Sequence, residues 1–192
     1  MHYLCRYTLC VVPFSASAQD KDWSGFYAGF DVGHETYKES EHLGGTQSYK
    51  FVDSSVGFGA HAGGRMQFDG GMVVGAEAFY YDANVDFVSD IEFHINGDEI
   101  FYPSRKLGRE MGVDMHAGLA LGNGLLYGLI GVSDVSSSVG PMSRAMRYGF
   151  GYDLRFNDTS SVRLQAISTD YNEKWLDTAK RTGVTLGYSY HF

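Results

Sequence analysis

The sequence predicts an all-β fold, an eight-stranded antiparallel up-and-down transmembrane β-barrel, and three observations carry this prediction. Apolar and polar residues alternate with a period of two over stretches of about 9 to 11 residues, the length at which a tilted strand crosses a bilayer. The connections between these stretches alternate between long polar segments and tight turns. The composition, with 25 Gly, 27 Phe and Tyr together and only three Pro, suits strands and tight turns.

The alternation of faces is clearest in the second and the last expected strands. The apolar face of the second carries Val56, Phe58, Ala60, Ala62, Gly64, Met66 and Phe68. The last expected strand repeats the pattern with Val184, Leu186, Tyr188, Tyr190 and Phe192. The first strand starts after Trp23, and the remaining strands are expected near 74–80, 110–121, 125–135, 147–156 and 162–166. Residues 125–135 are too uniformly apolar for their two faces to be told apart.

The order of the connections sets the number of strands. Tight hairpin turns are expected at 69–71, 122–124 and 157–160, which are rich in residues that tolerate positive φ. Longer polar segments are expected near 38–51, 86–104, 137–142 and 172–178. Four surface loops and three periplasmic turns imply eight strands with both termini in the periplasm. A soluble lipocalin-like barrel would have apolar residues inside instead, and strand length, aromatic strand ends and an export signal favour the membrane.

The N-terminal segment has the features of a cleavable signal peptide. Arg6 precedes a short apolar run, and Ala16, Ser17 and Ala18 form a small-residue cleavage pattern. We therefore expect residues 1–18 to be a signal peptide and residues 19–192 to be the barrel domain. The only two cysteines, Cys5 and Cys10, lie in this segment, which excludes a disulfide framework in the rest of the chain.

Composition also excludes other classes of protein. The longest apolar stretches fall short of the ~18 residues of a membrane-spanning helix, which excludes an α-helical membrane protein. The formal net charge of −8 argues against a nucleic-acid partner, which would require a basic surface.

Three short motifs resemble a known family. They are Trp23-Ser24-Gly25-Phe26-Tyr27-Ala28-Gly29-Phe30-Asp31-Val32-Gly33, Gly75-Ala76-Glu77 and Leu186-Gly187-Tyr188-Ser189-Tyr190-His191-Phe192. Over about residues 22 to 192 the chain resembles the small outer-membrane β-barrels of proteobacteria, which are related to the outer-membrane protein A barrel and to rhizobial and Brucella-type surface antigens. The resemblance implies a location in the bacterial outer membrane, contact with its lipids and lipopolysaccharide, and insertion by the barrel-assembly machinery. The family usually has an inward Glu on the seventh strand, where this chain has Gln165.

The inward faces of the expected strands carry many charges. The residues expected to form a polar network inside the barrel are Arg65, Glu77, Glu110, Asp114, Arg147, Asp153, Arg155 and Arg163, together with Arg181. Eight strands leave an interior just wide enough for side chains, so these charges should pair and plug it. We expect Arg65 and Glu77, on strands joined by the turn at 69–71, to belong to this paired interior. A narrow pore through the same residues is the alternative.

Other activities have weaker signals. The histidines, His2, His34, His42, His61, His94, His116 and His191, are scattered, so neither a metal site nor a cofactor is predicted. Some eight-stranded barrels that modify lipid A use a His and a Ser close together on a lipid-facing strand, but residues 166–172 contain Ser168 and no His. The chain is therefore predicted not to be an enzyme.

The committed function is that of a structural or surface protein of the outer membrane. Its final aromatics, Tyr188, Tyr190 and Phe192, are expected to be the assembly signal. The alternative is an adhesin-like module whose loops at 38–51 and 86–104 bind a host or phage surface.

Overall fold

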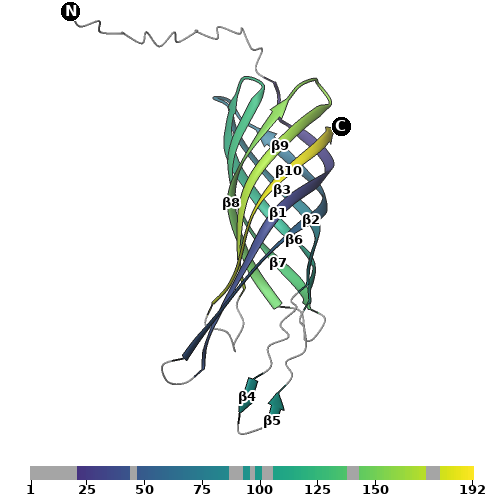
Figure 1. The fold of residues 1–192 in the computed structure, drawn as a ribbon. Helices are drawn as coiled ribbons and strands as arrows, with labels where there is room; N and C mark the ends of the chain where they lie inside the picture. Colours follow the sequence, from purple (N-terminus) through teal and green to yellow (C-terminus); the bar gives the residue numbers. More distant parts are fainter. Residues whose placement is uncertain are drawn as a thin grey trace, which may run out of the picture.

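In this computed structural model the chain forms one closed antiparallel barrel (Figure 1). The structure describes residues 21–43, 47–86, 93–95, 98–100, 106–137, 143–171 and 178–192. The barrel strands are β1 (Gly25–Leu43), β2 (Gln47–Gln67), β3 (Met72–Asp86), β6 (Lys106–Leu121), β7 (Gly124–Ser137), β8 (Ser143–Arg155), β9 (Ser160–Tyr171) and β10 (Thr178–His191). The expected signal peptide, residues 1–18, lies outside the described residues, as do most of the expected loop at 86–104 and parts of the other loops.

The topology confirms the predicted eight-stranded meander. The strand order around the barrel is β1-β10-β9-β8-β7-β6-β3-β2, and the small hairpin of β4 (Phe93–Ile95) and β5 (Asp98–Ile100) lies in the connection between β3 and β6. Pairing of β1 with β10 closes the barrel, from Tyr27 opposite His191 to Ser40 opposite Thr178. Closure leaves no open sheet edge, which is what a strand protein needs inside a bilayer.

The barrel has two unlike ends. At the turn end, tight turns join β2 to β3, β6 to β7 and β8 to β9, and Gly70, Gly71 and Gly122 adopt φ values of 85°, 83° and 62° there. The last residue belongs to this end, because the backbone N–H of Phe192 donates to the carbonyl of Phe26 at 2.9 Å. The opposite end, which we call the loop end, carries the longer connections and the β4–β5 hairpin (Figure 1).

The polar segment at 38–51 is mostly strand, which corrects the loop expected there. β1 continues to Leu43 and β2 begins at Gln47, with these two residues paired. Pairing of β2 with β3 starts only at Phe58, so the earlier part of β2 is paired with β1 alone. The β1–β2 hairpin therefore projects past the barrel wall at the loop end (Figure 1). Backbone pairing does not require an apolar face outside a bilayer, so the polar composition of this segment was a poor guide.

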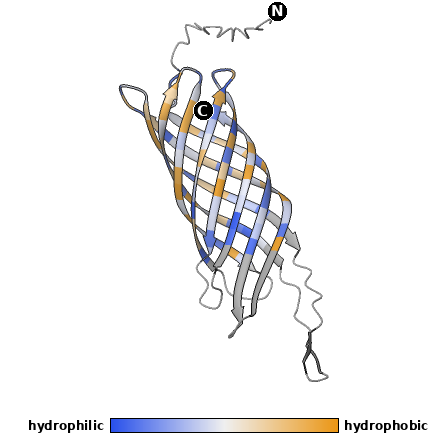
Figure 2. Cartoon of the chain, turned by 60° about the vertical axis from the view of Figure 1, so that its left-hand side comes forward, coloured by the Kyte–Doolittle hydropathy of each residue, from blue (hydrophilic) through white to orange (hydrophobic). Residues whose placement is uncertain are grey.

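The outer surface is apolar and the interior is largely polar. Exposed large side chains such as Phe30, Phe58, Met115, Phe150 and Leu186 cover the outer face of different strands. Hydrophobic and hydrophilic residues alternate along the strands in Figure 2. This is the reverse of a soluble barrel and is the polarity of a protein surrounded by lipid.

The structure also assigns the faces of β7, which the sequence left open. Leu125, Tyr127 and Leu129 point inward and are at most 5% exposed, whereas Leu126 and Ile130 are 50% and 55% exposed. One stretch of the interior is therefore apolar. In the part of the chain that the structure describes, no helix has the length and apolarity to cross a membrane.

Candidate functional site: the barrel interior

The turn end of the interior is closed by aromatic and aliphatic side chains. Trp23, Val73, Leu125, Tyr127 and Leu129 form a buried apolar cluster, in which Trp23 is 1% exposed. The short segment before β1 thus folds its Trp into the mouth of the barrel. Its backbone is held there by the amide of Trp23, which donates to Oε1 of Gln67 at 2.9 Å.

Arg155 joins this apolar cluster to the last strand. Its guanidinium donates to the backbone carbonyl of Asp22 at 2.6 Å and to Nδ1 of His191 at 2.9 Å, and it lies 4.7 Å from the centre of the Trp23 ring. Because Nδ1 accepts this hydrogen bond, the proton of the neutral ring is on Nε2, which lies 2.9 Å from Oγ of Ser161. Cation–π and hydrogen-bond contacts here take the place of an acidic partner.

In the middle of the barrel, Arg65 pairs across the lumen with Asp153. Nη1 of Arg65 lies 2.6 Å from Oδ2 of Asp153, and both side chains are 1% exposed. The other oxygen of Asp153 accepts from the Tyr127 hydroxyl at 2.9 Å. That hydroxyl accepts in turn from Nε2 of Gln165. The neutral amide of Gln165, at the position where the family usually has Glu, therefore serves as a donor to this chain of bonds.

Beside this pair, Arg163 holds two carboxylates at once. Its Nη1 and Nη2 donate to the oxygens of Glu77 at 2.6 and 3.1 Å, and its Nε and Nη2 donate to Asp31 at 2.9 and 3.0 Å. Asp31 also lies 2.8 Å from Nδ1 of His61. The planar fork of the guanidinium suits such double bidentate binding.

Toward the loop end, two arginines share three carboxylates. Arg147 contacts Asp114 at 3.2 Å and Glu110 at 3.3 Å. Arg181 forms ion pairs with Glu110 and with Glu35, the latter at 3.3 Å. All five side chains are at most 9% exposed.

The buried charges nearly balance. The buried carboxylates among the described residues are Asp31, Glu35, Glu77, Glu110, Asp114 and Asp153, and the buried guanidiniums are Arg65, Arg147, Arg155, Arg163 and Arg181. Six acids thus face five bases, an excess of one negative charge when the histidines are neutral. Near neutrality is what an interior of low dielectric constant demands, since an unpaired buried charge is costly.

The eight network residues named from the sequence, and Arg181, all lie on inward faces of the barrel and are buried. The pairing expected between Arg65 and Glu77 is wrong: Arg65 binds Asp153 on β8, and Glu77 binds Arg163 on β9. Long side chains reach across the lumen more readily than they turn back along their own wall. Asp31, Glu35 and His61 were missed as network members, although their strand parity already placed each of them on a polar face.

The inward glycines make room for aromatic rings. Tyr127 faces Gly118 on one neighbouring strand and Gly151 on the other, and a Cβ added at Gly151 would lie 2.5 Å from Cζ of the Tyr127 ring. Gly57 stands in the same relation to Tyr81, at 2.5 Å from Cε1. The space left by each of these glycines is therefore filled by a ring from an adjacent strand.

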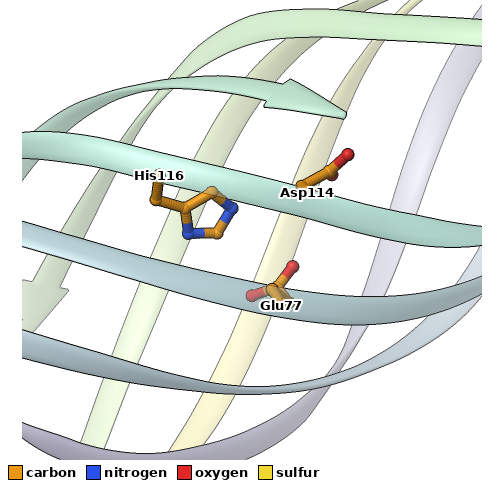
Figure 3. Close-up of side chains that lie close together, drawn as sticks. All are labelled: Glu77, Asp114 and His116. Carbon is orange, nitrogen blue, oxygen red and sulfur yellow. The ribbon is translucent and has the colours of Figure 1, made fainter. Parts of the chain in front are cut away.

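One cluster has the side chains of a metal site. Ligand atoms of Glu77 on β3 and of Asp114 and His116 on β6 lie within 4.8 Å of one another (Figure 3). Both ring nitrogens of His116 lack a hydrogen-bond partner among the described residues. Each carboxylate, however, is already bound by an arginine, Arg163 or Arg147. A cation could bind here only if these arginines withdrew, so the cluster as it stands is part of the ionic network.

The final aromatics lie on the outer face at the turn end. Tyr190 and Phe192 are 44% and 79% exposed, with their rings 5.3 Å apart at an interplanar angle of 77°. Tyr188 stacks on Phe30 at 5.6 Å and shares a hydrogen bond of 2.9 Å with Ser160.

A closed barrel with an apolar outer surface and a charged interior defines a transmembrane β-barrel. The chain matches the family of outer membrane protein β-barrel domains over residues 7–192, so it belongs to that family. The protein is thus a β-barrel of the bacterial outer membrane.

Solved structures with a similar fold have low sequence identity to the chain. Neisserial surface protein A has 13% identity and a TM-score of 0.59, with 88% of this chain and 98% of that chain covered. Ail of Yersinia pestis has 17% identity and a TM-score of 0.46, with coverages of 88% and 99%. OprG of Pseudomonas aeruginosa has 13% and 0.48, with 91% and 98%. At such identities the similarity concerns the fold alone. No curated protein matches the chain.

Proposed function

We propose that this protein is a structural surface barrel of the outer membrane, with an interior plugged by its ionic network and with its loop end outside the cell. The observation that carries the proposal is the cross-lumen pairing of buried charges, above all Arg163 with Glu77 and Asp31, and Arg65 with Asp153. Pairs of this kind tie opposite walls of the barrel together. They also occupy the space through which a water column would have to pass.

The proposed orientation follows from the two ends. Short turns suit the periplasmic side of such barrels and longer connections the outer side. The exposed final residues, Tyr190 and Phe192, would then lie at the periplasmic boundary of the bilayer. We propose that they serve there as the signal read by the barrel-assembly machinery.

Outer-membrane fractionation followed by electrophoresis of unboiled samples tests the proposal. The folded barrel should fractionate with the outer membrane and migrate anomalously until it is boiled, because a closed barrel resists unfolding by detergent. An epitope inserted between Leu43 and Gln47 should be accessible on intact cells. An epitope found only after cell lysis would contradict the orientation.

A surface-binding role is the second candidate. The projecting β1–β2 hairpin supports it, because paired backbone beyond the barrel wall presents a rigid surface to the outside. Replacing residues 41–49 by a short turn should then reduce attachment of expressing cells to a host surface or to phage while leaving the barrel heat-modifiable. Unchanged attachment would leave the structural role alone.

The pore and the lipid-modifying enzyme have less support. The cross-lumen pairs oppose a pore. Ser168 and His34 both lie on the outer face near the loop end, but their strands, β9 and β1, are separated by β10. Backbones two strands apart are ~10 Å from each other, too far for a nucleophile and its base. We propose no catalytic role.

A further inference from the structure

The outer wall of the barrel has a groove of about 490 Å³ across β8, β9, β10 and β1. Small side chains, Ala166 and Ser168 on β9 and Thr182 on β10, form its floor, and the rings of Tyr148 and Phe150 on β8 form one side. The volume is in the range of sites that bind small ligands. All these side chains point outward, so the groove opens toward the membrane and not toward the lumen.

Hydroxyl groups run along the groove in one transverse row. In the register of the sheet, Tyr148 faces Ser168, Ser168 faces Thr182, and Thr182 faces Thr36. Oγ of Ser168 has no hydrogen-bond partner among the described residues. Hydroxyls are unusual on a face that otherwise contacts hydrocarbon, since each one needs a partner that acyl chains do not offer.

The neighbouring rows differ in character on the two sides of the hydroxyls. Toward the turn end, the next row is apolar and contains Phe150, Ala166 and Val184. Toward the loop end, the next row places Lys180 directly opposite Lys38. Like charges in that position repel each other unless an anion lies between them.

Lys180 is only partly satisfied by its protein contacts. Its ammonium donates to the Tyr148 hydroxyl at 2.7 Å and lies 3.5 Å from Asp170. An ammonium has three donors, so at least one remains for another acceptor. Lys38 is exposed, and the two lysines with Asp170 leave a net positive charge at this edge of the groove.

The groove lies at the depth where a lipid headgroup begins. Ser168 is about eight residues along β9 from its start at Ser160, which places it roughly 20 Å from the turn end for a strand with a rise of ~3.3 Å per residue and a tilt of ~40°. The apolar band of such barrels is ~25 Å tall. The groove thus crosses the boundary between hydrocarbon and headgroups in the leaflet at the loop end.

We propose that this groove is a binding site for a phosphorylated glycolipid, the lipid A portion of lipopolysaccharide. Its acyl chains lie on the apolar row, its sugar and amide groups bind the hydroxyl row, and a phosphate binds between Lys38 and Lys180. The inference rests on the proposed function in one respect, the orientation that puts the loop end in the outer leaflet.

The test compares groove variants with a control on the opposite wall. Ser168→Leu combined with Thr182→Leu fills the groove and removes its hydroxyls, and Lys38→Gln combined with Lys180→Gln removes the phosphate contacts. Val132→Leu on β7 is the control, because Val132 is outward, 55% exposed and at a similar distance from the turn end. Retained lipopolysaccharide is measured by native mass spectrometry of protein extracted from outer membranes. In mixed vesicles, lipid A then competes with phosphatidylglycerol at equal charge.

We expect both groove variants to lose lipopolysaccharide about tenfold or more, while the control matches the unaltered protein. Equal retention by all variants, or retention of phosphatidylglycerol as strong as that of lipid A, would overturn the proposal and leave only ordinary lipid contact. If the leucine variant is not heat-modifiable, the lysine variant decides, because its exposed side chains do not support the fold. Epitope accessibility between Leu43 and Gln47 separately reports a failure of the proposed orientation.

Discussion

At the scale of single residues, the interior depends on arginines that each serve more than one acid. Arg163 binds Glu77 and Asp31, and Arg147 binds Asp114 and Glu110. One guanidinium with five donors satisfies two carboxylates without a second positive charge. This economy lets an eight-stranded lumen hold many charges without large voids.

Replacing Arg163 by methionine should therefore be severe, because it leaves the carboxylates of Glu77 and Asp31 buried without their cation. We expect a loss of ~3–5 kcal/mol in the free energy of unfolding, the cost of breaking a buried pair. Arg144→Met is the matched control, since Arg144 is 84% exposed and 3.8 Å from Asp134. Its effect should stay below about 1 kcal/mol. Urea unfolding of barrels refolded in lipid vesicles measures both, and equal losses would contradict the role of Arg163.

Double-mutant cycles distinguish the observed pairing from the pairing first expected. The cycle of Arg65→Met with Asp153→Asn should give a coupling energy toward the upper part of the ~0.5–3 kcal/mol range for residues in contact. The cycle of Arg65→Met with Glu77→Gln should give much less, because each residue has its own partner across the lumen. A larger coupling for Arg65 with Glu77 would reverse this assignment.

At the scale of elements, closure depends on the pairing of β1 with β10. The ladder runs from Tyr27 opposite His191 to Ser40 opposite Thr178. The end of β10 is further fixed by Phe192, whose amide donates to the carbonyl of Phe26. A strand that both closes the barrel and ends in exposed aromatics is well placed to be read during assembly.

Deletion of Phe192 should reduce the membrane-integrated protein and leave more of it in the periplasm. The deletion removes an exposed aromatic ring and the last hydrogen bond of the closing ladder. Phe156→Ala is the control, because Phe156 is another aromatic of the turn end and is 59% exposed. Fractionation with unboiled electrophoresis gives the folded share of each protein. Insertion that is unchanged by the deletion would rule out Phe192 as part of the assembly signal.

At the scale of the whole molecule, the structure combines three zones inside one wall. An apolar cluster around Trp23 closes the turn end, cross-lumen ion pairs fill the middle, and Arg147 and Arg181 with their acids occupy the part nearer the loop end. Where inward glycines leave space, rings such as Tyr127 and Tyr81 fill it. Conductance is the property that depends on all three zones together.

Purified protein in planar bilayers should show no stable large conductance. An interior of eight strands is only just wide enough for side chains, and here those side chains bond across it. Samples must be shown to be heat-modifiable, so that silence is not due to unfolded protein. Reproducible porin-sized steps from the monomeric barrel would overturn the plugged interior and favour the pore.

Much of this protein was determined by its sequence alone. The period of two, the tight turns and the order of connections predicted eight strands and their antiparallel meander, because alternation and turn chemistry are local properties of the chain. The same parity placed Arg65, Glu77, Glu110, Asp114, Arg147, Asp153, Arg155 and Arg163 on inward faces, where they are buried. Parity failed only for β7, whose residues are apolar on both faces.

Only the tertiary structure decided which charges pair and what the outer wall offers. Arg65 meets Asp153 and Arg163 meets Glu77 because closure brings β2 across from β8, and β3 across from β9, at distances that the sequence order does not encode. The lipid-facing groove arises in the same way, because Tyr148, Ser168, Thr182 and Thr36 come into one row through the register of four strands. Local patterns set which face a residue takes, whereas long-range closure and register set its neighbours.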